Sequence, residues 1–100
     1  MNEDAAAAIK AKAQFQLAGA MHQQGRLKEA QAIYEAILQS DPKQFDSLHM
    51  LGVIAAQSKN YELAADLLAR AIAINPTNSA FYSNRGIALQ SLKQLDAAVG

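Results

Sequence analysis

The sequence predicts an all-α protein in which antiparallel helical hairpins stack into a solenoid, an α-α superhelix, of about two and a half repeats. Three observations predict this fold: an internal period, apolar residues three and four apart, and a proline at the end of each unit. Pro42 and Pro76 are 34 residues apart, and Ala30, Ala64 and Ala98 have the same spacing. Repeats of this length bury their apolar faces by stacking on their neighbours.

Each unit is expected to contain two amphipathic helices. In the second half of the first unit, apolar residues fall at Leu27, Ala30, Ile33, Tyr34, Ile37 and Leu38. Strand-type alternation does not occur. The expected helices are 4–24, 27–39, 45–58, 61–74 and 79–92, followed by the start of another from residue 95. The chain is thus one domain, with a helical extension at 4–10, repeat 1 at about 11–44, repeat 2 at about 45–78 and a truncated repeat 3 at about 79–100.

Glycine, asparagine and proline indicate where the helices end. Gly25 adopts a left-handed backbone conformation easily, and Asn60 is the next best residue for the equivalent turn. Pro42 and Pro76 end each unit because proline lacks an amide donor and clashes with the preceding helical turn. The last helix is expected to be capped by Thr77, Asn78 or Ser79.

Small residues at fixed positions explain how the hairpins pack. Gly52 and Gly86 lie in the middle of helices, where glycine costs about 1 kcal/mol relative to alanine. Such glycines indicate that another helix approaches closely. Ala30, Ala64 and Ala98 are the matching small residues of the second helices, so large side chains can interlock around these points.

The pattern resembles the tetratricopeptide repeat (TPR) family. The shared features are the period, the Leu51-Gly52 step, the alanine in the second helix and the terminal proline. The sequence departs from the family at its frequent tryptophan, replaced by Gln14, Leu48 and Tyr82, at its first glycine, replaced by Ala18, and at a leucine replaced by Arg85. Arg85 at an inward position indicates either a snorkelling side chain or a partner from sequence beyond residue 100.

By position, the resemblance implies that the first helix of each hairpin lines a concave groove for a protein or peptide partner. The candidate residues are Lys12, Phe15, Gly19, His22, Gln23, Asp46, His49, Val53, Ala56, Gln57, Ala80, Ser83, Asn84, Ile87, Gln90 and Ser91. Phe15, Val53 and Ile87 are expected to form an apolar stripe, with space beside Gly19 and with glutamines and histidines bonding to peptide backbone. The alternative is that these are ordinary solvated positions and that the binding site lies in further repeats.

Two specialised versions of this groove fit the sequence less well. Some chaperone adaptors of the family hold a terminal carboxylate, but the corresponding positions here have no lysine or arginine. They are Phe15, Gly19, Met50, Ala80 and Asn84. Binding of an acidic chaperone tail is therefore not expected. Asn84 resembles the asparagine ladder of O-linked N-acetylglucosamine transferases, although Gln16 and Met50 interrupt it. A substrate-recruiting arm of such a glycosyltransferase remains the alternative function.

Composition makes several other functions improbable. Nine basic and nine acidic side chains cancel, so no net charge favours nucleic acid or anionic lipid. Cysteine is absent, and no uncharged apolar stretch approaches the roughly 20 residues of a membrane-spanning helix. The amino terminus is acidic where an export signal is basic. We expect a cytoplasmic protein that binds neither nucleic acid nor membrane.

No constellation of residues indicates catalysis, a cofactor or a metal. His22 and His49 are expected on neighbouring helices at heights that differ by roughly 10 Å, which is too far for ligands of one ion. Asp66 and Arg70 are expected to form an ordinary surface pair. No phosphate-binding glycine loop or nucleophile motif is present. The sequence therefore predicts a binding scaffold that is not an enzyme.

The third unit contains less than two full helices. In the first two units a second helix continues to a proline, and its counterpart here is expected to have covered Leu89 and Leu92. We therefore expect the amino-terminal fragment of a longer repeat protein, with self-association through the uncapped third repeat. Deliberate self-assembly is the second alternative function.

Overall fold

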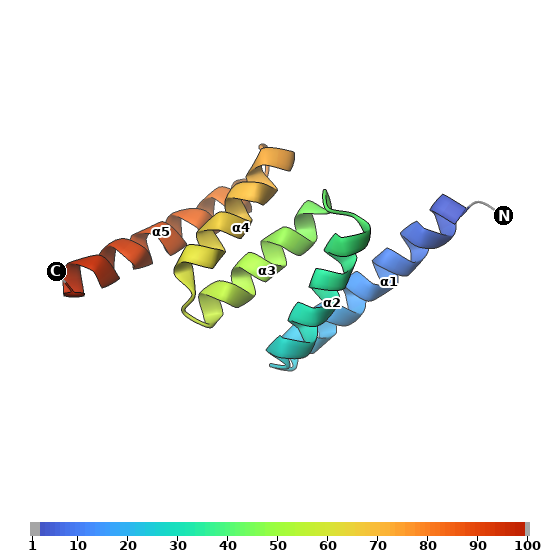
Figure 1. The fold of residues 1–100 in the computed structure, drawn as a ribbon, viewed down its shortest axis with the longest axis horizontal. Coiled ribbons are helices and arrows are strands. Elements are labelled where there is room, and N and C mark those ends of the chain that lie inside the picture. The colour runs from blue at the N-terminus through green and yellow to red at the C-terminus, as the bar shows by residue number, and fades with distance from the viewer. Residues whose placement is uncertain (1–2, 100) are drawn as a thin grey trace.

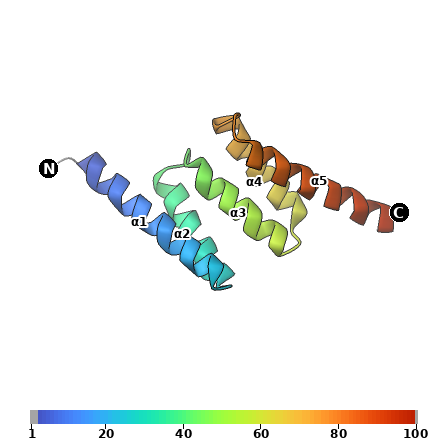
Figure 2. The ribbon, with the colours of Figure 1, turned by 180° about the vertical axis from the view of Figure 1, so that it is seen from behind.

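The computed structural model describes residues 3–99, and the side chains of residues 5–95. Five α-helices follow one another: α1 (Glu3–Gln23), α2 (Leu27–Ser40), α3 (Phe45–Gln57), α4 (Tyr61–Ile74) and α5 (Ser79–Val99). The second helices α2 and α4 form the layer nearer the viewer in Figure 1, and α1, α3 and α5 are in front in Figure 2. The all-α hairpin solenoid predicted from the sequence is confirmed, and it extends over 59 × 29 × 19 Å.

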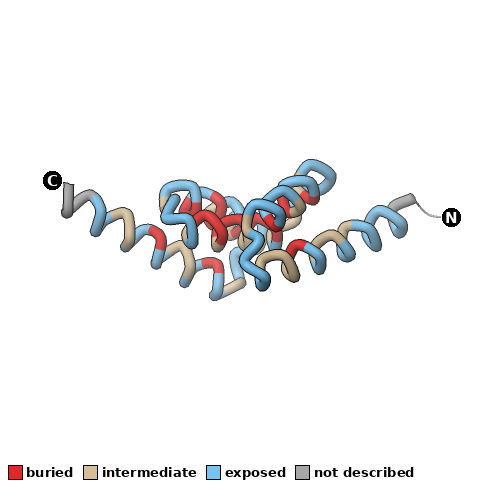
Figure 3. Tube along the Cα trace, turned by 90° about the horizontal axis from the view of Figure 1, so that it is seen from below, coloured by how far each residue is buried: buried red, intermediate tan, exposed pale blue. Residues whose placement is uncertain are grey.

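The core is a row of side chains between the two layers. Its largest fully buried members are Tyr34 and Ile37 of α2, Leu48 of α3, Leu68 of α4 and Phe81 of α5. Figure 3 shows that burial is concentrated in the middle of the molecule and decreases toward the free ends of α1 and α5. Each helix is therefore stabilised by its immediate neighbours, as expected of a repeat protein.

The prediction of close packing at small residues is confirmed at Gly52. A Cβ atom added to Gly52 would lie 2.9 Å from Cγ of Leu68, so α4 occupies the space that a side chain would need. Ala30 and Ala64 of the second helices are fully buried. Gly86 differs, because a Cβ atom there would meet nothing within 4 Å. The side chain of Ala98 lies outside the described residues.

The turn between α3 and α4 differs from the prediction. Gly25 has a φ of 77° as expected, but in the second hairpin the left-handed residue is Lys59, with a φ of 64°, and not Asn60. Asn60 instead precedes α4 and accepts a hydrogen bond from the backbone N–H of Leu63 at 3.4 Å. An asparagine at the first position before a helix stabilises it by capping a free backbone N–H. Asn60 takes this position, so the left-handed conformation, which is unfavourable for a residue with a side chain, falls on Lys59.

Side-chain caps also begin α3 and α5. Oε1 of Gln44 accepts a hydrogen bond from the backbone N–H of Ser47 at 2.6 Å. Among the three residues predicted to cap the last helix, Asn78 does so, since its Oδ1 accepts from the backbone N–H of Ala80 at 3.0 Å. These bonds satisfy amide donors that have no partner inside their own helix.

The expected break before residue 95 does not occur, and α5 continues as one helix to Val99. The corresponding turn after α3 depends on the Asn60 cap and on the packing of α4 against α3. The equivalent of Asn60 is Gln94, and within residues 3–99 no helix packs on this side of α5. Leu92, Lys93 and Gln94 are all good helix formers, so the helix continues.

Two expectations for charged residues have different outcomes. Asp66 and Arg70 do not form an ion pair; among the described side chains the ion pair is between Arg26 and Glu29, at 2.8 Å. An exposed pair contributes only a few tenths of a kcal/mol, which is too little to fix a long arginine side chain. Arg85 is half-buried, and its Nε is buried with no hydrogen-bond partner in the described structure. The buried Nε belongs to the guanidinium group, so burial of this side chain extends beyond its apolar stem.

Alanine substitutions at the two equivalent glycines should have opposite effects. Gly86→Ala should stabilise the protein by up to about 1 kcal/mol, because alanine favours the helix and the space is open. Gly52→Ala should destabilise it by about 1 kcal/mol net, since the clash with buried Leu68 outweighs the same gain. Urea unfolding followed by circular dichroism measures both changes. Equal effects at the two positions would show that the close approach at Gly52 is unimportant.

Candidate peptide-binding site

The predicted groove residues lie on the surface formed by α1, α3 and α5, which we call the first-helix face (Figure 2). None of the candidate residues on these helices is fully buried. The α3 and α5 helices contact one another directly, in addition to their contacts with α4. The face is therefore a continuous surface at α3 and α5, where side chains of successive repeats meet.

Two hydrogen bonds connect successive first helices across this face. Nε2 of His22 lies 2.6 Å from Oε1 of Gln57, and Nε2 of His49 lies 2.9 Å from Nδ2 of Asn84. In each case the two residues are 35 positions apart in the sequence. Four candidate side chains are thus partly engaged in joining α1 to α3 and α3 to α5. The amide nitrogen of Gln57 and the amide oxygen of Asn84 take no part in these two bonds.

The two histidines have different roles in these bonds. His22 donates, because the oxygen of Gln57 can only accept. His49 accepts from the amide of Asn84, which requires that its Nε2 carry no proton. The His49 ring is half-buried and packs 4.8 Å from the ring of Phe81, measured between centroids. Burial lowers the pKa of His49 from its ordinary value of 6.5, and the carboxylate of Asp46 opposes that shift. Burial and the hydrogen bond both favour neutral His49.

A hollow of about 300 Å³ lies beside the His49–Asn84 bond. We call it the first-helix hollow; it is lined by Gly52, Val53, Ala56, Gln57, Tyr61, Leu68, Asn84, Ile87 and Ser91. Six of the candidate residues thus come together: Val53, Ala56, Gln57, Asn84, Ile87 and Ser91. None of the lining residues is charged, so the hollow suits an uncharged apolar side chain surrounded by amide groups that can bond to a peptide backbone.

Three lining residues were not among the candidates: Gly52 of α3, and Tyr61 and Leu68 of the second helix α4. Only first helices had been considered as the lining of the groove. A signal was available for Leu68, because the glycine at position 52 indicated that a large side chain approaches there. No comparable signal identified Tyr61, whose equivalents in the 34-residue period are Leu27 and Leu95.

The predicted apolar stripe from Phe15 through Val53 to Ile87 is not continuous. Phe15 packs edge-on against Tyr34, with ring centroids 5.5 Å apart, and does not line the hollow. A Cβ atom on Gly19 would be 3.9 Å from the Tyr34 hydroxyl, so this tyrosine limits the space beside Gly19. The remaining candidates are exposed residues of the face outside the hollow: Lys12, Gln23, Asp46, Ala80, Ser83 and Gln90.

Within residues 3–99, none of the helices combines the length and apolar character that crossing a bilayer requires. The same part of the chain contains no group of three histidine, aspartate or glutamate side chains placed to hold a metal ion.

Comparison with known families identifies the chain. A family model described as tetratricopeptide repeat matches residues 15–79, and a second model with the same description matches residues 67–100. The chain belongs to the TPR family. Its repeats make it a protein-interaction module in general terms.

Individual relatives match parts of longer proteins. Small glutamine-rich tetratricopeptide repeat-containing protein 2 of Saccharomyces cerevisiae is 44% identical over 54 residues, which are 54% of this chain and 16% of that protein. An O-GlcNAc transferase mutant of Thermobaculum terrenum matches with a TM-score of 0.80 and 31% identity, over 89% of this chain and 16% of the transferase chain. This TPR chain thus spans about a sixth of the length of these two relatives.

Two further solved structures share the fold. The first TPR of Spaghetti, bound to an HSP90 peptide, matches with a TM-score of 0.80 and 25% identity, over 89% of this chain and 72% of that chain. A mutant of MamA matches with a TM-score of 0.77 and 23% identity, over 87% of this chain and 49% of that chain. Both structures share the helical arrangement of this chain.

Acidification should destabilise this TPR chain through His49. Because its pKa is lowered on folding, the unfolded chain takes up the proton first; the stabilisation is complete above about pH 6.5 and is lost as the pH falls through the folded-state pKa. Melting temperatures measured between about pH 7.5 and about pH 5.5 should fall less in His49→Gln than in the wild type.

His22→Gln is the matched control for this experiment. His22 donates its bond to Gln57 and does not accept one from it, so His22→Gln should retain the fall in melting temperature assigned to His49. A wild-type melting temperature that is constant over this pH range would contradict the assignment of neutral His49.

Proposed function

We propose that this TPR chain binds a peptide segment of a partner protein at the first-helix hollow. The principal supporting observation is the grouping of Val53 and Ile87 with the amides of Gln57 and Asn84 in one uncharged hollow. Ile87 is 59% exposed, so apolar surface is available to a ligand. An apolar side chain of the peptide would enter the hollow, and the amides would bond to the peptide backbone on either side of it.

The uncharged lining also bears on which peptides bind. Charged peptide groups would lose hydration in the hollow without gaining an ion pair there, so a neutral apolar anchor is favoured. The Spaghetti TPR was solved with an HSP90 peptide. For the present chain we propose weak or no binding of such acidic tails at this hollow, because its lining offers no lysine or arginine to a carboxylate.

Glutamate at the hollow should reduce peptide affinity. For a peptide selected from a display library against this chain, Val53→Glu should raise the Kd at least about tenfold, because it places an unpaired charge against the apolar anchor. Fluorescence anisotropy of the labelled peptide measures the change. Ile74→Glu, an exposed residue of α4 outside the hollow, is the matched control and should bind normally.

Circular dichroism of Val53→Glu should match the wild type, which separates a loss of binding from a loss of folding. Unchanged peptide affinity in a folded Val53→Glu protein would refute the proposed site.

A second candidate function is a substrate-recruiting arm of a larger enzyme. The 31% identity with the Thermobaculum terrenum O-GlcNAc transferase over most of this chain favours it. Asn84, the residue that resembles the asparagine ladder, lies on the first-helix face, although its Nδ2 already donates a hydrogen bond to Nε2 of His49. In this case too the TPR segment would bind protein, and chemistry would belong to another domain. The two functions are distinguished by whether the parent gene also encodes a glycosyltransferase domain.

The third candidate, self-association, is favoured by an exposed surface on α5. Tyr82 and Leu89 are 48% and 42% exposed, whereas their equivalents in the preceding repeat, Leu48 and Ala55, are 1% and 6% exposed beneath α4. Gly86 lies between them and has open space around it. This surface is adapted to contact a helix, and a second copy of the chain would cover it.

Self-association should depend on concentration and on Leu89. Light scattering of the wild type should show an average mass that increases with concentration, whereas Leu89→Glu should remain monomeric because its charge would be buried in the interface. A strictly monomeric wild type at high concentration would disprove this proposal, and Lys59→Glu, on an exposed turn, is the charge-change control.

A further inference from the structure

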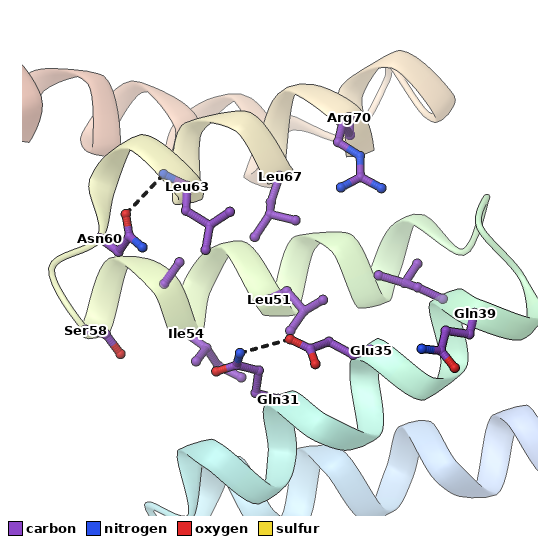
Figure 4. Close-up of a pocket in the computed structure, with 12 residues that line it drawn as sticks. Gln31, Glu35, Gln39, Leu51, Ile54, Ser58, Asn60, Leu63, Leu67 and Arg70 are labelled. Atoms are coloured by element: carbon purple, nitrogen blue, oxygen red, sulfur yellow. Dashed lines mark hydrogen bonds between the residues drawn. The ribbon is translucent and has the colours of Figure 1, made fainter.

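A larger hollow lies on the opposite layer of the molecule, between α2 and α4 (Figure 4). We call it the second-helix groove. Its volume is about 540 Å³, and it is lined by Gln31, Glu35, Leu38, Gln39, Leu51, Ile54, Ala55, Ser58, Asn60, Leu63, Leu67 and Arg70. It shares no residue with the first-helix hollow, so the two can be tested independently.

The floor of this groove is apolar. Leu51, Ile54 and Ala55 of α3 line it although most of their surface is already buried by α2 and α4. Leu67 continues the floor on α4, and Leu63 at the rim is 44% exposed. An apolar side chain inserted here would contact leucine and isoleucine on three sides and would cover exposed surface of Leu63.

The two walls have opposite charges. On α2, Glu35 accepts a hydrogen bond from Nε2 of Gln31 at 2.9 Å. On α4, Arg70 extends over the other side of the groove, near the end at which Gln39 lies (Figure 4). Arg70 has no ion-pair partner among the described side chains, since Asp66 does not pair with it. A cation next to an apolar floor is thus available to a ligand that has a carboxylate at this end.

We propose that the second-helix groove binds an extended peptide segment of a partner protein in which an apolar side chain is followed by a carboxylate. The apolar side chain would occupy the floor around Leu51 and Ile54, and the carboxylate would pair with Arg70. Glu35 would repel an acidic group placed farther along the groove, so it favours one position for the carboxylate.

The polar groups of the groove favour an extended ligand over a helical one. A helix satisfies its own backbone N–H and C=O groups and is about 10 Å wide, so it would rest on the rim. An extended segment has free backbone N–H groups, which can donate hydrogen bonds to the side-chain oxygens of Glu35, Gln39 and Asn60. It can also direct single side chains to the floor.

The test uses the ¹⁵N-labelled chain and two probe peptides, acetyl-Leu-Ser-Leu-Glu-amide and acetyl-Leu-Ser-Leu-Lys-amide. Amide chemical shifts followed during titration should change mainly at the floor and rim residues Leu51, Ile54, Leu63 and Leu67. The glutamate peptide should bind about threefold to fivefold more tightly than the lysine peptide, as expected for one exposed ion pair.

Variants of Arg70 identify the charged contact. Arg70→Gln should abolish the preference for the glutamate peptide, and Arg70→Glu should reverse it. Lys28→Glu, which makes the same charge change on an exposed part of α2 outside the groove, should retain the preference. Arg70 is exposed, so both Arg70 variants should fold, and circular dichroism checks this.

Equal affinity of the wild type for the two peptides would overturn the proposal, as would shift changes centred on Val53 and Ile87. Val53→Glu should leave this titration unchanged, so a failure here is distinguishable from a failure at the first-helix hollow.

Discussion

The close approach of α3 and α4 at Gly52 determines how the rest of the molecule is assembled. Cγ of Leu68 occupies the position next to Gly52 where a side chain would otherwise project, so the two helices pack with little space between them. α4 can then contact α5 on its other side, and fully buried Ala64 and Ala71 permit this arrangement. The first helices are thereby gathered on one face and the second helices on the other, and each candidate site forms between helices of neighbouring repeats.

The central helix α3 contributes to both hollows because of ordinary helical geometry. Residues two positions apart on a helix point about 200° from one another, so Leu51 and Val53 face opposite sides. Leu51 lines the second-helix groove, and Val53 lines the first-helix hollow. Gly52, the residue between them, faces Leu68 of α4. One helix with an apolar surface on several sides therefore contributes to the core, to the floor of the second-helix groove and to the first-helix hollow.

The contents of the candidate site were only partly predictable. Membership of the first-helix face followed from the 34-residue period, and Val53, Gln57, Asn84 and Ile87 do meet in one hollow. The period did not indicate that the histidines bond to Gln57 and Asn84, because such bonds depend on distances between residues 35 positions apart. For the same reason the period did not predict that Phe15 packs against Tyr34 or that Tyr61 lines the first-helix hollow.

By itself the sequence determined the two helices of each of the first two repeats, their order, and where prolines and Gly25 end them, because these properties depend on residues within one or two helical turns. Only the tertiary structure decided which equivalent positions behave alike. Leu68 occupies the space beside Gly52, whereas the space beside Gly86 is open. Lys59 adopts the left-handed conformation of a turn, whereas its equivalent Lys93 lies within a continuous helix. The physical reason is that packing against a neighbouring helix, and not the local sequence pattern, sets the environment of each of these residues.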